Sequence, residues 1–248
     1  MQYTGSPVAF KLFELEVYWY AILIVTGMIL AVNLSSKELE KRNMDGDLIY
    51  DLAFYLLPFS IIGARLYYVV FEWDQFRGDF FKMINPRTGG LAIHGGIIFG
   101  VIAGLIFVKR RKVDFFKLSD VIMPFLSLAQ AIGRWGNFIN NEAYGGPTDL
   151  PWALIIDGQK VHPTFLYESI GDFLIFIFLL YYLRNKQKKD GQTTMLYLIL
   201  YGILRFGVEG LRTDSLMIGG LRQAQLISLF GIIIGIIGLV IMSKKEKK

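Results

Sequence analysis

Seven predominantly apolar runs alternate with short polar segments along this chain. Each run is near the ~20 residues that an α-helix needs to cross a bilayer. This pattern predicts an all-α polytopic membrane protein with seven transmembrane helices. Three glycines in the last run, Gly231, Gly235 and Gly238, predict close packing of that helix against a neighbour. The predicted spans cover residues 17–34, 48–71, 93–108, 114–138, 164–183, 194–211 and 226–242.

Lysine and arginine are unevenly divided between the two sets of connecting segments. The segments at 37–42, 109–117, 184–189 and 244–248 hold sixteen of these residues, and the other set holds seven. By the positive-inside rule the first set is cytoplasmic. The N-terminus is then expected outside and the C-terminus in the cytoplasm, as an odd number of spans requires.

The outer segments have some structure of their own in this prediction. Residues 72–92 form one outer loop, with Pro86 and the pair Gly89-Gly90 as breakers. Residues 140–163 form a second, in which Asp157-Gly158 between two apolar-rich stretches predicts a β-hairpin with a type I′ turn. The whole chain, 1–248, is predicted to be one integral membrane domain with these two external elements.

Composition agrees with a membrane protein and narrows the chemistry. Hydrophobic residues make up 54% of the chain and charged residues 19%, against about 25% charged in soluble domains. Cysteine is absent, so a zinc–thiolate site and a cysteine nucleophile on the protein are excluded. The two histidines leave little room for a histidine-rich metal site, and no cofactor is predicted. The net charge of +5 reflects membrane topology and not binding of nucleic acid.

Three arginines, Arg65, Arg134 and Arg205, fall inside predicted spans. A charge at the centre of a membrane helix costs roughly 3 kcal/mol on insertion scales, and catalysis or ligand binding is the usual reason to retain it. With the predicted topology, every unusual polar side chain lies in the outer half of its span. This placement predicts a polar cavity open to the outer leaflet or outer surface. The residues concerned are Tyr20, Arg65, His94, Arg134, Asn137, Glu142, His162, Glu168, Tyr201, Arg205 and Glu209.

Structural explanations stand beside the functional one for several of these residues. Arg205 and Glu209 are spaced as a helical ion pair, and a structural pair is as good an explanation as a site. Arg65 is better explained by snorkelling or by a carboxylate partner than by catalysis. A single interfacial histidine is more often structural than a general base, and Glu168 could serve only to hold neighbouring helices.

The segment around Arg134 is harder to explain by structure alone. Gly133 and Gly136 flank the arginine, so that backbone can approach closely, and three asparagines and a glutamate follow within eight residues. Two arginines that face one cavity would form a phosphate clamp, because guanidinium stays charged and grips phosphate oxygens bidentately. In an outer-leaflet cavity the most available phosphate is that of a lipid headgroup.

Proton transfer at such a site has two candidates. His94 is the inward-facing group whose ordinary pKa, near 6.5, suits a general base. Tyr201 could orient a substrate or relay a proton. Because the chain has no cysteine, direct transfer from lipid to acceptor is the simpler mechanism.

The stretch Gly133-Arg134-x-Gly136-Asn137-Phe138-x-Asn140-x-Glu142-x-x-Gly145 resembles the signature of the bacterial prolipoprotein diacylglyceryl transferases. The resemblance extends over nearly the whole chain, and its shorter parts follow in the family's order. These parts are Trp19-Tyr20, His94-Gly95-Gly96, His162-Pro163-Thr164-x-x-Tyr167-Glu168 and Tyr201-x-x-x-Arg205-Phe206-x-x-Glu209, followed by Arg212.

The resemblance implies an enzyme of the bacterial cytoplasmic membrane whose active site faces the outer leaflet. Such an enzyme moves the diacylglyceryl group of phosphatidylglycerol onto the lipobox cysteine that follows the signal peptide of a preprolipoprotein. The product is a thioether, glycerol phosphate is released, and the reaction is the first step of lipoprotein maturation.

The resemblance also implies roles for individual residues. Arg134 and Arg205 would hold the phosphate, with Asn137 and Glu142 shaping that site. His94 would accept the thiol proton, with Tyr201 as its rival or partner. The remaining matched positions would support lipid binding and the placement of the arginines: Tyr20, Gly95 and Glu209.

Three other classes of protein compete with this interpretation. A transporter of anions would have polar residues near the midplane and access from both sides, whereas the polar residues here are one-sided. An intramembrane hydrolase is disfavoured because Gly-x-Ser-x-Gly, paired aspartates and HExxH are all missing. A purely structural or binding protein leaves the arginines and the signature unexplained.

Overall fold

In a computed structural model, the described part of the chain comprises residues 1–85, 89–215 and 217–244. The predicted breaker Pro86, Arg87 of the outer charge count, and the last three lysines of the cytoplasmic count lie outside the described residues. The chain divides into two compact units, one formed by Met1–Ser35 with Ser119–Lys248 and the other by Ser36–Leu118. The single domain over 1–248 stays a prediction.

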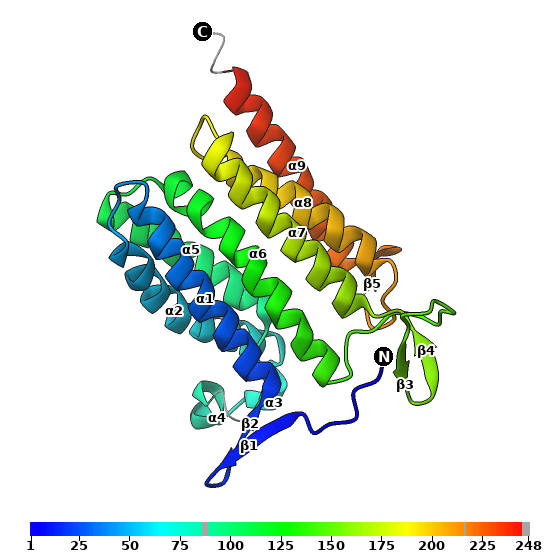
Figure 1. The fold of residues 1–248 in the computed structure, drawn as a ribbon. Helices are drawn as coiled ribbons and strands as arrows, with labels where there is room; N and C mark the ends of the chain where they lie inside the picture. Colours follow the sequence, from blue (N-terminus) through cyan, green and yellow to red (C-terminus); the bar gives the residue numbers. More distant parts are fainter. Residues whose placement is uncertain (86–88, 216, 245–248) are drawn as a thin grey trace. The chain divides into compact units, whose positions relative to one another are not determined.

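The first unit holds most of the long helices (Figure 1). It begins with a hairpin, β1 and β2, and contains the greater part of α1 and of α6, two further hairpins, and three consecutive helices that lead to the C-terminus. Its elements are β1 (Val8–Leu12), β2 (Leu15–Tyr18), α1 (Trp19–Glu40), α6 (Phe115–Ile139), β3 (Leu154–Ile156), β4 (Gln159–Val161), α7 (Thr164–Asn185), α8 (Gln192–Glu209), β5 (Met217–Ile218), β6 (Leu221–Arg222) and α9 (Gln223–Lys244).

The second unit consists of the end of α1, the helices α2 to α5 and the start of α6. The long helices α2 and α5 pack against each other, and two short helices lie in the loop between them. Their bounds are α2 (Asp47–Phe71), α3 (Trp73–Phe76), α4 (Phe80–Ile84) and α5 (Ile93–Arg111).

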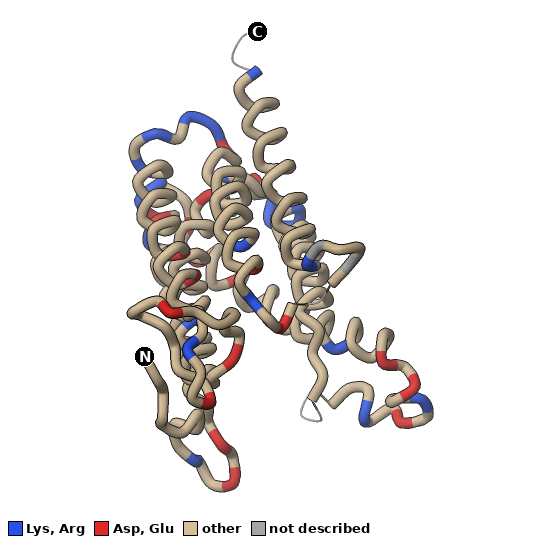
Figure 2. Tube along the Cα trace, turned by 90° about the vertical axis from the view of Figure 1, so that its right-hand side faces the viewer, with Lys and Arg blue, Asp and Glu red and all other residues tan. Residues whose placement is uncertain are grey.

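All seven predicted runs are helical in the structure. Six of the helices, α1, α2, α5, α6, α7 and α9, are long and apolar enough to cross a membrane. Helix α9 has no charged residue between Arg222 and its last residue, Lys244, and the helix that leads to the C-terminus is drawn in tan up to that blue end in Figure 2. Helix α8 coincides with the sixth predicted run but is not among the six, and it carries Arg205 and Glu209. The structure therefore confirms an all-α membrane protein, and the count of seven spans stays a prediction.

The hairpin predicted around Asp157-Gly158 is confirmed. Strands β3 and β4 pair antiparallel with Ile156 opposite Gln159. Asp157 and Gly158 both have positive φ, 48° and 78°, as a type I′ turn requires.

The hairpin of β1 and β2 was not predicted, and neither was the short one of β5 and β6. The β1–β2 pair joins Lys11 to Glu16 through an ion pair of 2.7 Å between Nζ and Oε1. Its strands are short and run directly into the apolar residues of α1, so the helical run obscured their alternation.

The glycines of α9 pack closely against α8, as predicted. A Cβ on Gly235 would lie 2.7 Å from the carbonyl oxygen of Met195, and one on Gly238 would lie 2.4 Å from the Met195 sulfur. On the facing side, a Cβ on Gly202 would lie 3.0 Å from the carbonyl oxygen of Ser228. Small residues on both helices thus let the two backbones approach.

A buried carboxylate on α6 fixes the start of α8. Asp120 is 1% exposed, and its Oδ1 accepts from the backbone N–H and the hydroxyl of Thr194, both at 2.7 Å. Its Oδ2 accepts from the backbone N–H of Gly191 and from the side chain of Gln187, both at 2.6 Å. Asp120 therefore caps the orphan donors at the N-terminus of α8 from a neighbouring helix, which holds α8 in place against α6.

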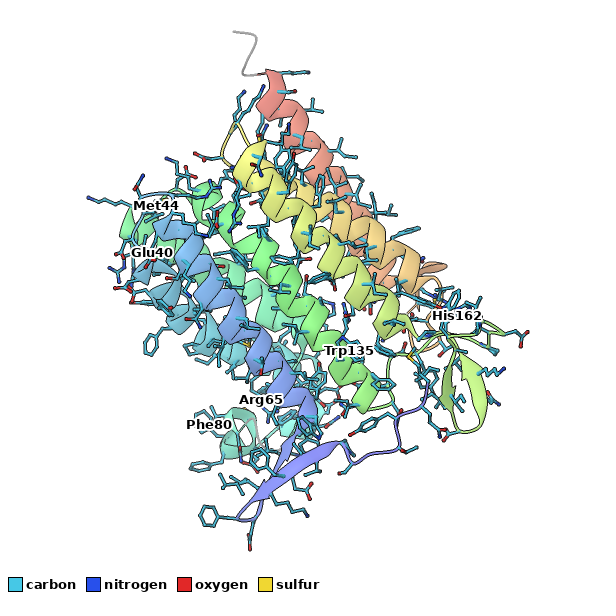
Figure 3. All side chains as sticks on the ribbon, in the orientation of Figure 1. Glu40, Met44, Arg65, Phe80, Trp135 and His162 are labelled. Carbon is cyan, nitrogen blue, oxygen red and sulfur yellow. The ribbon has the colours of Figure 1, made fainter. Side chains whose placement is uncertain are left out.

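In the second unit Arg65 organises the loop between α2 and α5. It is 5% exposed, and its guanidinium donates to the carbonyl oxygens of Met83 at 2.9 Å, Lys82 at 2.6 Å, Gly90 at 2.9 Å and Gly89. Figure 3 labels Arg65 near Phe80, the first residue of α4. The structural explanation of Arg65 is supported, through its hydrogen bonds to these four backbone carbonyls.

Candidate active site

The segment after Arg134 ends α6 in a Schellman motif. The N–H of Glu142 donates to the carbonyl of Asn137 at 3.0 Å, and the N–H of Asn141 donates to that of Phe138 at 3.2 Å. Asn141 has φ 50°, the left-handed conformation that such a helix end requires and that asparagine tolerates. One of the three asparagines is thus explained by the backbone alone.

The other two asparagines hold the Glu142 side chain. Asn137 Nδ2 donates to Glu142 Oε1 at 2.9 Å, and Asn140 Nδ2 approaches the same oxygen at 3.4 Å. Asn137 and Glu142 are thus in direct contact, and their role in binding substrate stays a prediction. Their joint effect is a rigid polar edge at the end of α6.

Gly136 lets α1 cross close to this end of α6. A Cβ on Gly136 would lie 2.3 Å from a ring carbon of Tyr20, so no side chain fits there. Beside this contact, residues of α1 and α6 surround a cavity of about 240 Å³. Its walls include Tyr20, Gln130, Gly133, Arg134 and Asn137, together with Ile24, Met28 and Ala129. Three of the predicted site residues, Tyr20, Arg134 and Asn137, therefore line the same cavity.

Arg134 and Arg205 meet at Glu168. The Oε2 of Glu168 lies 3.3 Å from Nη1 of Arg134, and its Oε1 accepts from Nη1 of Arg205 at 2.5 Å. The Glu168 side chain is 2% exposed, against 19% and 17% for the two arginines. Glu168 was expected to face the outer cavity or to hold neighbouring helices, and it joins helices by bridging the two arginines of the predicted clamp, Arg134 on α6 and Arg205 on α8.

The network continues along α8. Arg205 Nη2 lies 2.6 Å from Oε2 of Glu209, which confirms the predicted ion pair. Arg212 lies 4.0 Å from the same carboxylate and binds Asp214 with two hydrogen bonds of 2.9 and 2.7 Å. The hydrogen bonds from Arg212 lower the pKa of Asp214 below its ordinary value.

One member of this network was not among the predicted site residues. Asp172 lies one helical turn after Glu168 on α7, is fully buried, and has Oδ2 at 3.9 Å from Nε of Arg134. A carboxylate within an apolar run, four residues after another, was a signal that could have identified it.

Gly145, the last residue of the signature, ties three segments together. Its N–H donates to the carbonyl of His162 at 2.9 Å, and the next N–H, of Gly146, donates to the carbonyl of Leu211 at 2.9 Å. A Cβ on Gly145 would lie 2.7 Å from the Cβ of His162. Figure 3 labels His162 before the start of α7 and Trp135 on α6. His162 thus has a structural setting, with Nδ1 also 3.3 Å from the hydroxyl of Tyr167.

Tyr201 lies on α8, one turn before Arg205, as its spacing predicts. Its ring stacks on that of Tyr197, with centroids 5.5 Å apart and planes 10° from parallel. Tyr197 donates in turn to Oε1 of Gln130, a residue of the cavity wall, at 3.0 Å.

His94 and Gly95 belong to the second compact unit, at the start of α5. The imidazole lies 6.2 Å from the ring of Tyr67 between centroids. A Cβ on Gly95 would lie 2.3 Å from the carbonyl oxygen of Gly63, so α5 crosses α2 at this glycine. The predicted convergence of His94 with Arg134 on one cavity stays a prediction. Among the described residues, no group of three or more His, Asp or Glu side chains is arranged to hold a metal ion.

The fold and the buried network together define a polytopic helical membrane protein with an arginine–carboxylate site beside a small cavity. The family of prolipoprotein diacylglyceryl transferases has a sequence model that matches residues 7–241. The chain is 54% identical to a phosphatidylglycerol–prolipoprotein diacylglyceryl transferase of Finegoldia magna over 96% of both chains. It is 52% identical to one of Clostridioides difficile, over 97% of this chain and 96% of the other, and 46% identical to one of Clostridium botulinum, over 98% and 99%.

The chain therefore belongs to the prolipoprotein diacylglyceryl transferase family. The resemblance found in the sequence is confirmed, and with it the assignment as a bacterial membrane transferase of lipoprotein maturation.

Proposed function

We propose that this protein transfers the diacylglyceryl group of phosphatidylglycerol to the thiol of the lipobox cysteine of preprolipoproteins. The thiolate sulfur attacks the phosphate-bearing carbon of the diacylated glycerol, and the bond between that carbon and the phosphate oxygen breaks. The bonding electrons leave with the phosphate oxygen, so the products are a thioether and glycerol phosphate. The observation that carries this proposal is the meeting of Arg134 and Arg205 at Glu168, beside a cavity that Arg134 lines.

Arg134 is the arginine best placed to receive the phosphate. It lines the cavity together with Asn137 and Tyr20. A guanidinium has five N–H donors, and the contact with Glu168 is made by Nη1, so other donors of Arg134 can bind a phosphate. Positive charge held in advance at the phosphate stabilises the negative charge that develops on the leaving group. Asn137 and Glu142 shape the same edge, and Tyr20 closes it.

Arg205 acts beside Arg134 in this proposal. Carboxylate oxygens of Glu168 and Glu209 lie 2.5 and 2.6 Å from its two terminal nitrogens, and these contacts hold the guanidinium in one position. A fixed cation costs no reorganisation when charge develops during the reaction. Glu209 is therefore proposed to position Arg205 and not to contact the lipid chemically.

The acceptor of the thiol proton is proposed to be His94, with Tyr201 as the alternative. The thiolate is the nucleophile, and removal of the proton from a thiol with pKa ≈ 8.5 suits imidazole near neutral pH. His94→Asn and Tyr201→Phe separate the two. The base variant should lose kcat most at low pH and recover in part as pH rises and free thiolate accumulates, whereas the other variant should show no such recovery.

The proposed topology has seven spans, with the N-terminus outside, the C-terminus in the cytoplasm and the site open to the outer leaflet. Helix α8 is the seventh span in this arrangement, and its polar face is accommodated because Glu168 and Glu209 neutralise Arg205 inside the bundle. Because the chain contains no cysteine, a single introduced cysteine can be labelled without removal of native ones. A cysteine introduced at Asp157 should react with an impermeant reagent only from the outer side. A cysteine introduced at Lys189 should react only from the cytoplasmic side. The reverse result would invert the topology.

Release of glycerol phosphate from phosphatidylglycerol tests the roles of the arginines. Arg134→Lys and Arg205→Lys keep the charge but lose the bidentate fork, and each should lower kcat/KM on the order of 10²-fold or more. Arg111→Lys, at an arginine half exposed and paired with Asp51, is the matched control and should stay near the wild type. Full activity of Arg134→Lys would remove the phosphate clamp from the proposal.

A further inference from the structure

Asp172 differs from the other carboxylates of the buried network. Its side chain is fully buried, and neither carboxylate oxygen accepts a hydrogen bond from any described residue. Within the described part of the chain, its one cationic neighbour within ion-pair distance is Arg134, with Nε 3.9 Å from Oδ2. By contrast, Glu168 and Glu209 have arginine nitrogens at 2.5 and 2.6 Å.

The formal charges of the network balance only while no substrate phosphate is bound. The buried part contains three arginines, Arg134, Arg205 and Arg212, and three carboxylates, those of Glu168, Asp172 and Glu209. Asp214, which also pairs with Arg212, is 51% exposed and is therefore screened by solvent. A phosphodiester bound at Arg134 would add one further negative charge. Carboxylates that share a buried site with excess negative charge cannot all stay ionised, because burial disfavours the charged form and like charges repel.

The geometry indicates which carboxylate is protonated with the smallest loss of contacts. Protonation of Glu168 would weaken ion pairs to both arginines, and protonation of Glu209 would weaken the close pair with Arg205 and the longer one with Arg212. Protonation of Asp172 would weaken one long contact and remove no hydrogen bond. Asp172 is therefore the group whose neutral form loses least.

We propose that Asp172 takes up a proton when the phosphate of the lipid headgroup binds at Arg134, and that it releases this proton when glycerol phosphate leaves. The proton comes from solvent and returns to it, so no bond of the lipid is made or broken in the step. The titratable and charged groups around Asp172 are Arg134 from α6, Glu168 from α7 itself, and Arg205, Tyr197 and Tyr201 from α8. Asp172 is thus a positioning residue that sets the charge Arg134 presents to substrate. The inference rests on the proposed function.

The direction of the pH dependence follows from proton uptake. Binding that takes up a proton weakens as pH rises, by up to about tenfold per pH unit while uptake is complete. Asp172→Asn has nearly the shape of the protonated side chain and cannot titrate. The variant should bind lipid with little dependence on pH, and at alkaline pH its KM for phosphatidylglycerol should be lower than that of the wild type. A carboxylate with only a structural role would instead lower activity at every pH without a change in this dependence.

Calorimetric titration with dihexanoyl phosphatidylglycerol measures the proton directly. The purified full chain in a zwitterionic detergent is titrated in two buffers of equal pH and different ionisation enthalpy, and the difference in heat gives the protons taken up. The wild type and Asp157→Asn, a matched aspartate-to-asparagine change at the exposed hairpin turn, should take up a proton on binding, and Asp172→Asn should take up none.

Proton uptake by Asp172→Asn equal to that of the wild type would overturn the assignment to Asp172. If the wild type takes up no proton on binding, the proposal is wrong. This test needs no variant, so it remains decisive even if Asp172→Asn fails to fold. A wild type that neither binds the lipid nor releases glycerol phosphate would contradict the proposed function instead, and the two failures are thereby distinguished.

Discussion

Replacement of Glu168 by glutamine is the perturbation that tests the buried network most severely. The change removes one negative charge that both arginines share, at oxygen–nitrogen distances of 3.3 and 2.5 Å. Glutamine offers one carbonyl oxygen to one arginine and turns an NH₂ group toward the other. Because guanidinium has donors and no acceptor, that second contact places donor against donor.

The magnitude follows from burial. Removing one partner of a buried ion pair costs about 3–5 kcal/mol, since it leaves an uncompensated charge. Asp172 and Glu209 still neutralise part of the charge on the arginines, so we expect Glu168→Gln to lower the free energy of unfolding by about 3 kcal/mol, at the lower end of that range. The matched control is Asp51→Asn, which breaks the pair of Asp51 with Arg111, whose side chains are 43% and 50% exposed. An exposed pair contributes about 0–1 kcal/mol.

The assay is denaturant unfolding of both variants in the same mixed micelles, monitored by tryptophan fluorescence and checked for reversibility. Glu168→Gln should shift the midpoint strongly and Asp51→Asn hardly at all. Equal shifts for the two variants, or a Glu168→Gln protein more stable than the wild type, would refute the reasoning that buried charge compensation holds α6, α7 and α8 together.

Three further predictions follow from other parts of the structure. Gly136→Ala should cost about 1–3 kcal/mol by overpacking, because its Cβ would lie 2.3 Å from a tyrosine ring, whereas Gly133→Ala, with 4.0 Å to its nearest neighbour, should stay within about 0.5 kcal/mol in the same denaturant unfolding assay. Arg65→Gln should speed proteolysis within 72–92, since four carbonyls lose most of their donors; unchanged cleavage would contradict its structural role. The hydrogen bonds from Arg212 lower the pKa of Asp214, so this ion pair makes a small, partly screened contribution to stability. The contribution is present above about pH 4 and is lost as pH falls through the lowered pKa of Asp214. Melting temperatures of Asp214→Asn and the wild type should therefore converge in acid.

Much of the fold could be predicted because its strongest signals are local. An apolar run of about 20 residues predicts a helix regardless of its partners, and all seven runs are helical. Asp157-Gly158 predicts its own turn, since both residues adopt positive φ without help from the rest of the chain. The pair of Arg205 and Glu209 belongs to the same class, because helical spacing alone brings the two side chains together.

The remaining contacts of the site could not be predicted because they depend on how helices pack. Glu168 is 34 residues from Arg134 in sequence and 37 from Arg205, and nothing local shows that one carboxylate bridges both. The position of Asp172, four residues after Glu168 in an apolar run, marks it as unusual, but its contact with Arg134 could not be predicted because that arginine lies on another helix. Asn141 shows the opposite case: it was counted among the polar residues that follow Arg134, but its left-handed backbone at the end of α6 explains it.

The most direct test of the central claim is a transfer reaction with purified protein. The full chain in micelles of phosphatidylglycerol is mixed with a peptide that carries a lipobox, and the products are analysed by mass spectrometry for a thioether-linked diacylglyceryl peptide. The account predicts this product with the cysteine peptide, equimolar release of glycerol phosphate, and neither with a Cys→Ser peptide. A folded protein that binds phosphatidylglycerol but forms no thioether would contradict it.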